Sequence, residues 1–367
     1  MANGETSPSS RSVLGTLALV FLAMVILSSA DTFLARRERS ENHAEAERLA
    51  AAGRMADPIH AVADFKSAIS IERENPDYWL ELGKAQLAAG QLSDAEATLT
   101  ELLRRDSTSG AVNLALARVL VKEGRIADAV SAYHRAIYGH WDRGAEANRV
   151  DVRFELVNLL ARQGSKEESL AELLPLLDMA PDDLELRKRL GHLFLAAGSA
   201  PRAGEIFRDI LSSHPQDADA YAGLGESEFA GGNYQTAHTD FQTAANLRPS
   251  DEAIHGRLEL SAEVLGLDPM RRGLSPEEQY RRSLKMLDLA TAAITRCASL
   301  PSPLDSETIE EAQKAMENRS SPARLSDAVE SNLNLAEQLW KIRQEQCKQA
   351  PTAEEEPLRL VLAKIAQ

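Results

Sequence analysis

Small and apolar residues recur along this chain at intervals of 34 positions, separated by mostly polar stretches. One set consists of Leu190, Gly191, Ala203, Phe207 and Pro215, and the next consists of Leu224, Gly225, Ala237, Phe241 and Pro249. A fixed period of this length indicates stacked helix pairs, because each pair leaves an apolar face that only its neighbours can cover. Period-two runs of Val, Ile and Thr are scarce, so the pattern predicts an all-α chain.

The pattern extends upstream with one irregularity. Helical periodicity begins at His43, and regular units start at Trp79 and Leu116. The next unit, at Leu156, follows its predecessor by 40 residues instead of 34, which predicts an insertion of about six residues near 138–148. Ahead of Trp79, a first unit has a recognisable second helix around Phe65 and a degenerate first helix. The array therefore comprises about six helix pairs over residues 43–265.

Each residue type suits its place in the unit. A glycine falls between the two helices of each unit, at Gly90, Gly124, Gly164, Gly198 and Gly232. Glycine adopts at little cost the left-handed backbone that ends a helix. Alanines stand where two helices cross closely, aromatic residues fill the space between stacked pairs, and prolines end the second helix.

These spacings, which follow the pattern W-x2-L-G…A-x3-F…P from Ala44 to Asp251, resemble those of the tetratricopeptide repeat family. The resemblance implies a right-handed superhelix with a concave groove lined by the first helix of each pair. It also implies that the groove binds a peptide or a protein segment and that the chain is a non-catalytic scaffold.

Within such a repeat, the residue after each Leu-Gly-like pair and the residue three positions later are expected to face the groove. These residues are Lys84, Leu87, Arg118, Val121, Asn158, Ala161, His192, Leu195, Glu226 and Phe229. The predicted groove is basic at one end and acidic at the other, with an apolar floor. An extended or helical segment with an acidic residue and apolar anchors would fit it. The alternative is that the groove is filled internally and these residues are only its solvated rim.

Beyond Asp251 the period fails. Residues 266–350 are expected to form a helical cap, because an open solenoid end needs a polar outer face. Its helices are predicted to start at Ser275, at Ser306 and near Pro322. The tail, residues 351–367, is acidic at first and then amphipathic.

The start of the chain has a different character. Val13 to Leu27 carry no charge and are almost all apolar, Arg11 precedes them, and small residues follow. Residues 1–30 are therefore expected to be either a removable export signal or a retained membrane anchor that inserts through residues 13–30. Residues 31–42 are expected to link this segment to the array. We expect the body of the protein to be exported and not cytoplasmic, although arginines on both sides leave the orientation open.

Cys297 and Cys347 are the only cysteines. In an oxidising compartment they could form one disulfide that closes a loop of about 50 residues. The alternative is two small buried thiols. Neither cysteine has the spacing of a metal site.

Charge and motifs narrow the function further. The net charge of −15 argues against nucleic-acid binding, which requires an excess of Lys and Arg. None of the eight histidines forms a zinc-binding pair, and no phosphate-binding glycine loop is present, so no metal, cofactor or enzymatic activity is expected. The leading interpretation is a membrane-tethered scaffold. Its rivals are an accessory or catalytic subunit of an envelope enzyme acting through the C-terminal helices, and a structural assembly protein; the oligomeric state is not predicted.

Overall fold

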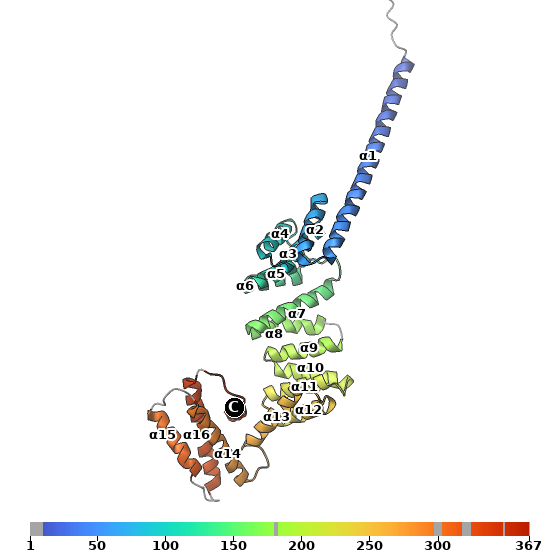
Figure 1. Ribbon diagram of the computed structural model, residues 1–367. Coiled ribbons are helices and arrows are strands. Elements are labelled where there is room, and N and C mark those ends of the chain that lie inside the picture. Colours follow the sequence, from blue (N-terminus) through green and yellow to red (C-terminus); the bar gives the residue numbers. More distant parts are fainter. Residues whose placement is uncertain (1–9, 180–182, 297–302, 318–323, 348, 367) are drawn as a thin grey trace, which may run out of the picture. The chain divides into compact units, whose positions relative to one another are not determined.

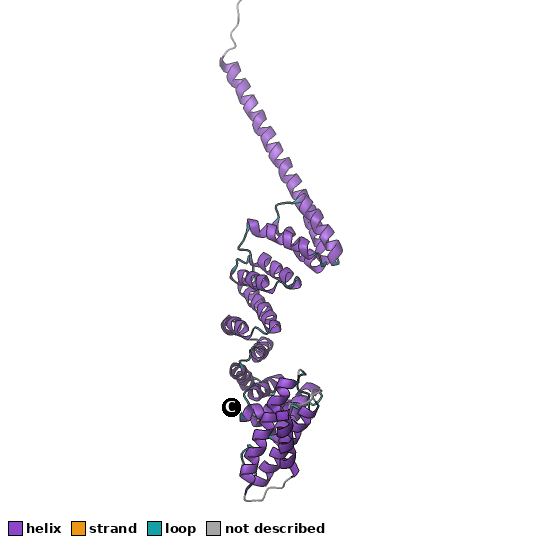
Figure 2. Ribbon diagram, turned by 90° about the vertical axis from the view of Figure 1, so that its left-hand side faces the viewer, coloured by secondary structure: helices purple, strands orange, loops and turns teal. Residues whose placement is uncertain are grey.

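The computed structural model describes the chain except residues 1–9, 180–182, 297–302, 318–323, 348 and 367 (Figure 1). Figure 2 shows helices and loops, and the part of the chain that the structure describes contains no strand. The predicted all-α class is therefore confirmed. Contacts within the chain define two compact units, Met1–Leu156 and Val157–Gln367.

The first unit is built from one long helix and successive helix pairs. Its helices are α1 (Ser10–Met55), α2 (Pro58–Ile71), α3 (Pro76–Ala88), α4 (Leu92–Arg105), α5 (Gly110–Lys122) and α6 (Ile126–Tyr138), and α7 (Ala145–Gln163) begins in this unit and ends in the second. Asp57 and Asn75 accept hydrogen bonds from the first free backbone N–H groups of α2 and α3, which fixes where these helices begin. At the predicted glycines Gly90 and Gly124, φ is +75° and +77°, the left-handed conformation that turns one helix into the next.

The end of α1 supplies the leading helix of the first repeat. Ala46 and Ala50 of α1 are fully buried and form one core cluster with Phe65 of α2 and Tyr78 of α3. At Gly53, an added Cβ would lie 3.1 Å from the ring of Phe65, so the two helices cross closely there. This helix is degenerate in sequence because alanine and glycine, and not the usual Leu-Gly pair, make its contacts.

The N-terminal part of α1 corrects the predicted localisation. Residues 31–42, expected as a linker, continue the same helix, and Phe21, Leu22 and Leu34 are exposed on it. Across the described residues, no helix combines the length and the apolar character that crossing a membrane requires. The prediction of a single N-terminal membrane anchor is therefore wrong. The predicted localisation, a membrane protein with an exported body, is corrected with it. Residues 1–9 of the predicted segment lie outside the described residues.

Most residues of the predicted insertion lengthen α7, and the loop between α6 and α7 accounts for the rest. Helix α7 has 19 residues, whereas α5 has 13, and the loop before α7 returns to the start of α5. There the backbone N–H of Gly110 donates to the carbonyl of His140, and that of His140 donates to the carbonyl of Thr108, both at 2.7 Å. Trp141 packs so closely on Gly110 that an added Cβ would lie 2.3 Å from its indole nitrogen. The loop before α7 is thus held by backbone pairing and by one aromatic ring.

The second unit continues the helix pairs and ends in a bundle. Its helices are α8 (Lys166–Met179), α9 (Leu184–Ala196), α10 (Ala200–Ser213), α11 (Ala218–Ala230), α12 (Tyr234–Leu247), α13 (Glu252–Leu267), α14 (Pro276–Thr295), α15 (Pro303–Glu317), α16 (Leu325–Gln346) and α17 (Glu356–Ile365). Phe207 of α10 and Phe241 of α12 are fully buried, each filling the space between stacked pairs. An added Cβ at Gly191 or at Gly225 would approach those rings to within 2.6 and 2.8 Å, so these positions require glycine.

The C-terminal helices share one hydrophobic core with the last repeat. That core joins Phe241 of α12, Val264 of α13 and Met286 of α14 to Trp340 of α16. The amphipathic tail is helix α17, and its residues Leu358 and Val361 are fully buried in the same core. The Nζ of Lys364 lies 2.8 Å from Oδ2 of the buried Asp268, which fixes α17 beside the end of α13.

One cysteine of the predicted disulfide lies in the described part of the chain. Cys347 follows the last residue of α16 and is disulfide-bonded. Cys297 lies outside the described residues, so the pairing of these two cysteines stays a prediction. Beside Cys347, Arg343 donates to the carbonyls of Gln349 and Ala350 and to the carboxylate of Glu355, which anchors the loop between α16 and α17.

Candidate functional site

The predicted groove residues divide between the two units. Lys84 and Leu87 on α3 and Arg118 and Val121 on α5 belong to the first, whereas Asn158 and Ala161 on α7, His192 and Leu195 on α9, and Glu226 and Phe229 on α11 belong to the second. All of them lie on the first helix of a pair, as the repeat pattern predicts. Their surroundings differ, because some face an open hollow and others are covered by residues of the next repeat.

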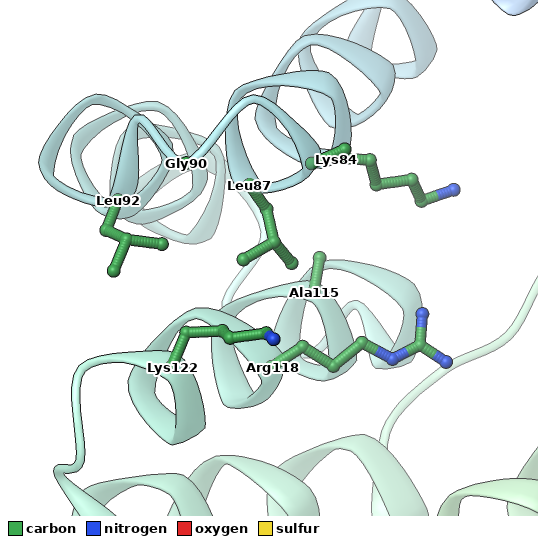
Figure 3. A pocket seen from close by; sticks show the side chains of 8 residues that line it. Lys84, Leu87, Gly90, Leu92, Ala115, Arg118 and Lys122 are labelled. Carbon is green, nitrogen blue, oxygen red and sulfur yellow. The ribbon is translucent and has the colours of Figure 1, made fainter. Parts of the chain in front are cut away.

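An open hollow lies between α3 and α5 in the first unit (Figure 3). Its volume is about 630 Å³. It is lined by Lys84, Leu87, Ala88, Gly90, Leu92, Ala115, Arg118 and Lys122. Leu87 points from α3 toward Ala115 on α5, and Leu92 of α4 closes one side (Figure 3). The structure therefore brings together three predicted groove residues, Lys84, Leu87 and Arg118, while Val121 is not among the lining residues.

Sequence reasoning did not assign five of the lining residues to the groove: Ala88, Gly90, Leu92, Ala115 and Lys122. Ala115 and Lys122 stand three positions before and four positions after Arg118, so helical spacing alone could have placed them on the same face of α5. Leu92 begins α4, the second helix of its pair, and no rule for the first helix would have found it. The missed residues add a second lysine and most of the apolar floor.

The three cations of the hollow differ in their partners. Lys84 pairs with Glu81 on its own helix at 2.8 Å, an exposed contact of the kind that adds little stability. Arg118 makes a two-pronged pair with Glu155 of α7, with Nε–Oε2 at 3.0 Å and Nη2–Oε1 at 2.5 Å. The hydrogen bonds that Arg118 donates to Glu155 raise the pKa of Arg118 above its ordinary value. Lys122 has no ion-pair partner among the described residues.

A recurring pair of positions explains why the hollow is open. In the second unit, Glu226 is bridged by Arg257, which stands 31 residues later on the next first helix. Arg118 and Glu155 form the same kind of contact between neighbouring first helices, but here the earlier residue is basic and the later one acidic. They are 37 residues apart and not 31, because the insertion lies between them. The residue 31 positions after Lys84 is Ala115, and its methyl group cannot form an ion pair with Lys84. The hollow thus lies at a position where this inter-repeat pair is missing.

The groove face of the second unit is filled by its own side chains. The guanidinium of Arg257 bridges to Glu226 and also lies 4.3 Å from the centre of the Phe229 ring, which is almost completely buried. The ring of His192 meets Phe207 edge-on at 5.1 Å, and partial burial there lowers the pKa of His192. At this end, the alternative of an internally filled groove describes the geometry better than an open groove does.

A smaller cavity of about 400 Å³ lies beside α17 in the second unit. Its walls include Phe229 and Tyr234 of the last repeat and Arg359 and Lys364 of α17. The charged groups are paired within the chain, since Arg359 binds Glu356 and Lys364 binds the buried Asp268. No cluster of three or more metal-ligating side chains occurs among the residues that the structure describes. This cavity is therefore a less favourable ligand site than the hollow of the first unit.

Comparison with known families agrees with the repeat geometry. Family models of the tetratricopeptide repeat match residues 49–119, 114–184, 154–218 and 188–252, which together cover more than half of the chain. The chain is a tetratricopeptide repeat protein. The resemblance inferred from the residue spacing is confirmed for the repeats. Tetratricopeptide repeats form scaffolds whose extended concave surfaces carry protein interactions.

Curated relatives of this tetratricopeptide repeat protein are distant and longer. Human Superkiller complex protein 3 is 24% identical over 282 residues, which is 71% of this chain and 17% of that protein. The Peroxisomal targeting signal receptor of Komagataella phaffii is 26% identical over 191 residues, covering 52% of this chain and 27% of the receptor. The chain thus spans less than a third of the length of either relative.

Two solved repeat structures are also distant from this chain in sequence. The chain is similar to YrrB, described as a tetratricopeptide repeat protein with an unusual peptide-binding site, at 18% identity and a TM-score of 0.42. That similarity covers 52% of this chain and 95% of YrrB. The C-terminal part of a repeat protein from Cytophaga hutchinsonii is 12% identical with a TM-score of 0.49, covering 66% of this chain and 95% of that one.

Proposed function

We propose that this protein is a non-catalytic scaffold that binds a peptide or protein segment in the hollow between α3 and α5. The observation that carries the proposal is the hollow itself, where an apolar floor lies next to cationic side chains. Leu87, Leu92 and Ala115 provide a surface on which one or two aliphatic side chains of a partner would be removed from water. An apolar anchor beside a charged rim is the usual arrangement of a peptide site.

The charges define the partner further. Lys84, Arg118 and Lys122 line the hollow in a chain whose net charge is −15, so the charged side chains of its lining are all basic. A segment with an acidic residue close to a leucine-like side chain complements both features. The relative from Komagataella phaffii is named a targeting signal receptor, and binding of a short segment by this chain would be a comparable use of the repeats.

An array of 12-residue peptides tests the proposal. The peptides carry two leucines three or four positions apart, combined with one to three glutamates. We expect the full chain to bind a subset of them and Leu87→Glu to bind that subset at least tenfold more weakly, because a carboxylate would replace the apolar floor. Leu195→Glu is the matched control, since Leu195 occupies the same place in a repeat of the second unit and is likewise partly buried. Equal loss in both variants, or in neither, would refute the hollow as the site.

The geometry of the C-terminal helices does not favour the enzyme hypothesis. Their buried charges are committed to structural pairs, with Arg343 bound to Glu355 at 2.8 Å and Asp268 bound to Lys364 at 2.8 Å. A catalytic acid or base needs a shifted pKa and access to a substrate, whereas these groups hold helices together. We therefore propose no catalytic role for this region.

A further inference from the structure

Glu155 occupies the binding geometry that a partner's carboxylate would use at Arg118. Its two oxygens face Nε and Nη2 of the guanidinium, the two-pronged arrangement in which arginine holds carboxylates most specifically. The hydroxyl of Tyr133 donates to Oε2 of the same carboxylate at 3.3 Å, which helps to hold it in place. Arg118 is therefore already engaged by an anion of this chain, as is Lys84, which pairs with Glu81.

The contact is partly exposed, so an external anion has access to it. The side chain of Arg118 is 43% exposed and that of Glu155 is 34% exposed. A solvent-accessible ion pair is only modestly stable, and a second carboxylate brought close by apolar contacts competes for it at high local concentration. Arg118 lines the hollow whereas Glu155 does not, so a bound segment approaches the guanidinium from the side of the hollow.

From these contacts we infer that Glu155 is an internal competitor for the carboxylate of the bound segment and thereby sets how acidic a partner must be. This inference rests on the function proposed above. In the free protein, Glu155 neutralises Arg118. In the complex, a carboxylate of the segment takes over the guanidinium while Lys84 and Lys122 hold further acidic residues. A segment with a single acidic residue competes poorly, and one with several competes well.

The variant Glu155→Gln tests the inference with the same peptide array. Glutamine still accepts hydrogen bonds from Tyr133 and Arg118 but carries no charge. We expect it to bind glutamate-containing peptides about fivefold more tightly than the parent does, with the largest gain for peptides that carry one glutamate. Peptides with glutamine in the same places should bind the two proteins within twofold of each other.

A matched control is available in the same unit. Glu96 pairs with Arg125 across neighbouring repeats at 2.7 Å, and its side chain is also 34% exposed, but neither residue lines the hollow. Glu96→Gln changes the net charge by the same amount and should leave peptide binding within twofold. A second variant, Tyr133→Phe, keeps the charge of Glu155 but removes the hydroxyl that holds it, and it should strengthen binding of acidic peptides by about twofold.

The outcomes separate this inference from the proposed function. If Glu155→Gln binds acidic peptides as weakly as the parent, or more weakly, while Leu87→Glu still abolishes binding, the competitor role is wrong and the hollow remains the site. If Glu96→Gln gained as much affinity for acidic peptides as Glu155→Gln, the competitor role would also be wrong, because the change in net charge alone would then explain the gain. If Leu87→Glu does not weaken binding, the proposed function itself fails.

Discussion

Asp240, on α12, is a carboxylate in an unfavourable environment. Its Oδ2 is buried and accepts no hydrogen bond from the described residues. Burial, reinforced by the nearby charge of Glu228 and opposed in part by Arg208, raises the pKa of Asp240 from 3.8 to about 6. Because the pKa is higher in the folded than in the unfolded chain, the fold favours the protonated acid. Ionisation therefore opposes folding, and stability falls as the pH rises from about 4 to about 6.

This environment makes Asp240→Asn a stabilising substitution at neutral pH. Asparagine resembles the protonated acid, so we expect the variant to exceed the parent by about 1 kcal/mol in free energy of unfolding at pH 7, after allowance for partial exposure. At pH 4, where the aspartate is largely protonated in the folded state, the difference should be small. Urea unfolding at both pH values measures it. Equal midpoints at pH 7 would show that the carboxylate is solvated well enough to ionise freely.

At the scale of helices, charged pairs connect consecutive first helices of the array. Glu226 with Arg257, and Arg118 with Glu155, are two versions of the same contact with opposite polarity. The contact is replaced by small residues at two places, Ala115 opposite Lys84 and Gly223 opposite His192. An added Cβ at Gly223 would lie 2.3 Å from the ring of Phe207, so aromatic packing fills that place. Ala115 is itself only 2% exposed, and its short methyl group leaves the hollow beside it open.

Restoring the missing pair should close the hollow. In Ala115→Glu, the new carboxylate would stand opposite Lys84 as Glu155 stands opposite Arg118. We expect this variant to bind array peptides at least tenfold more weakly and to melt several degrees below the parent, because Ala115 is only 2% exposed and a glutamate there has to be accommodated. Ala115→Gln is the control for size and should lose less affinity. A variant that melts normally and binds normally would contradict our explanation of the hollow.

Much of the helical order could be predicted from sequence because the repeat pattern is local. The glycines, alanines and aromatic residues of each unit report contacts within one pair or with the next, so a single period revealed the array. The candidate site was harder to predict from the sequence. Lys84, Leu87 and Arg118 followed from helical phase, but Glu155 lies 37 residues from Arg118, across an insertion whose course the sequence did not specify.

The same limit applies to the predicted groove residues of the second unit. Glu226 and Phe229 fit the phase of the groove, yet Arg257 covers both, because the fate of an exposed position depends on the side chain that the next repeat presents. The membrane anchor was predicted from the composition of residues 13–30. It was corrected by the finding that no described helix is long and apolar enough to cross a membrane. Composition indicated a segment type but did not establish where that segment resides.

At the scale of the whole molecule, charge separates the site from the rest of the chain. A net charge of −15 repels acidic segments over long distances, whereas the basic side chains around the hollow would attract them over short ones if the proposed function holds. Added salt screens both effects, so the proposed binding would rely on direct contact with Leu87 and Leu92 as well as on charge. The C-terminal helices contribute stability to the last repeat, since α17 completes a core that includes Phe241.

The measurement that tests the central claim most directly is photo-crosslinking of a selected array peptide to the full chain. The peptide carries a photoreactive group beside its leucines, and mass spectrometry identifies the residues that it labels. Our account predicts labels on residues 84–92 and 115–122, and their loss in Leu87→Glu but not in Leu195→Glu. Labels concentrated on α9 to α13 or on the C-terminal bundle, and unaffected by Leu87→Glu, would contradict it.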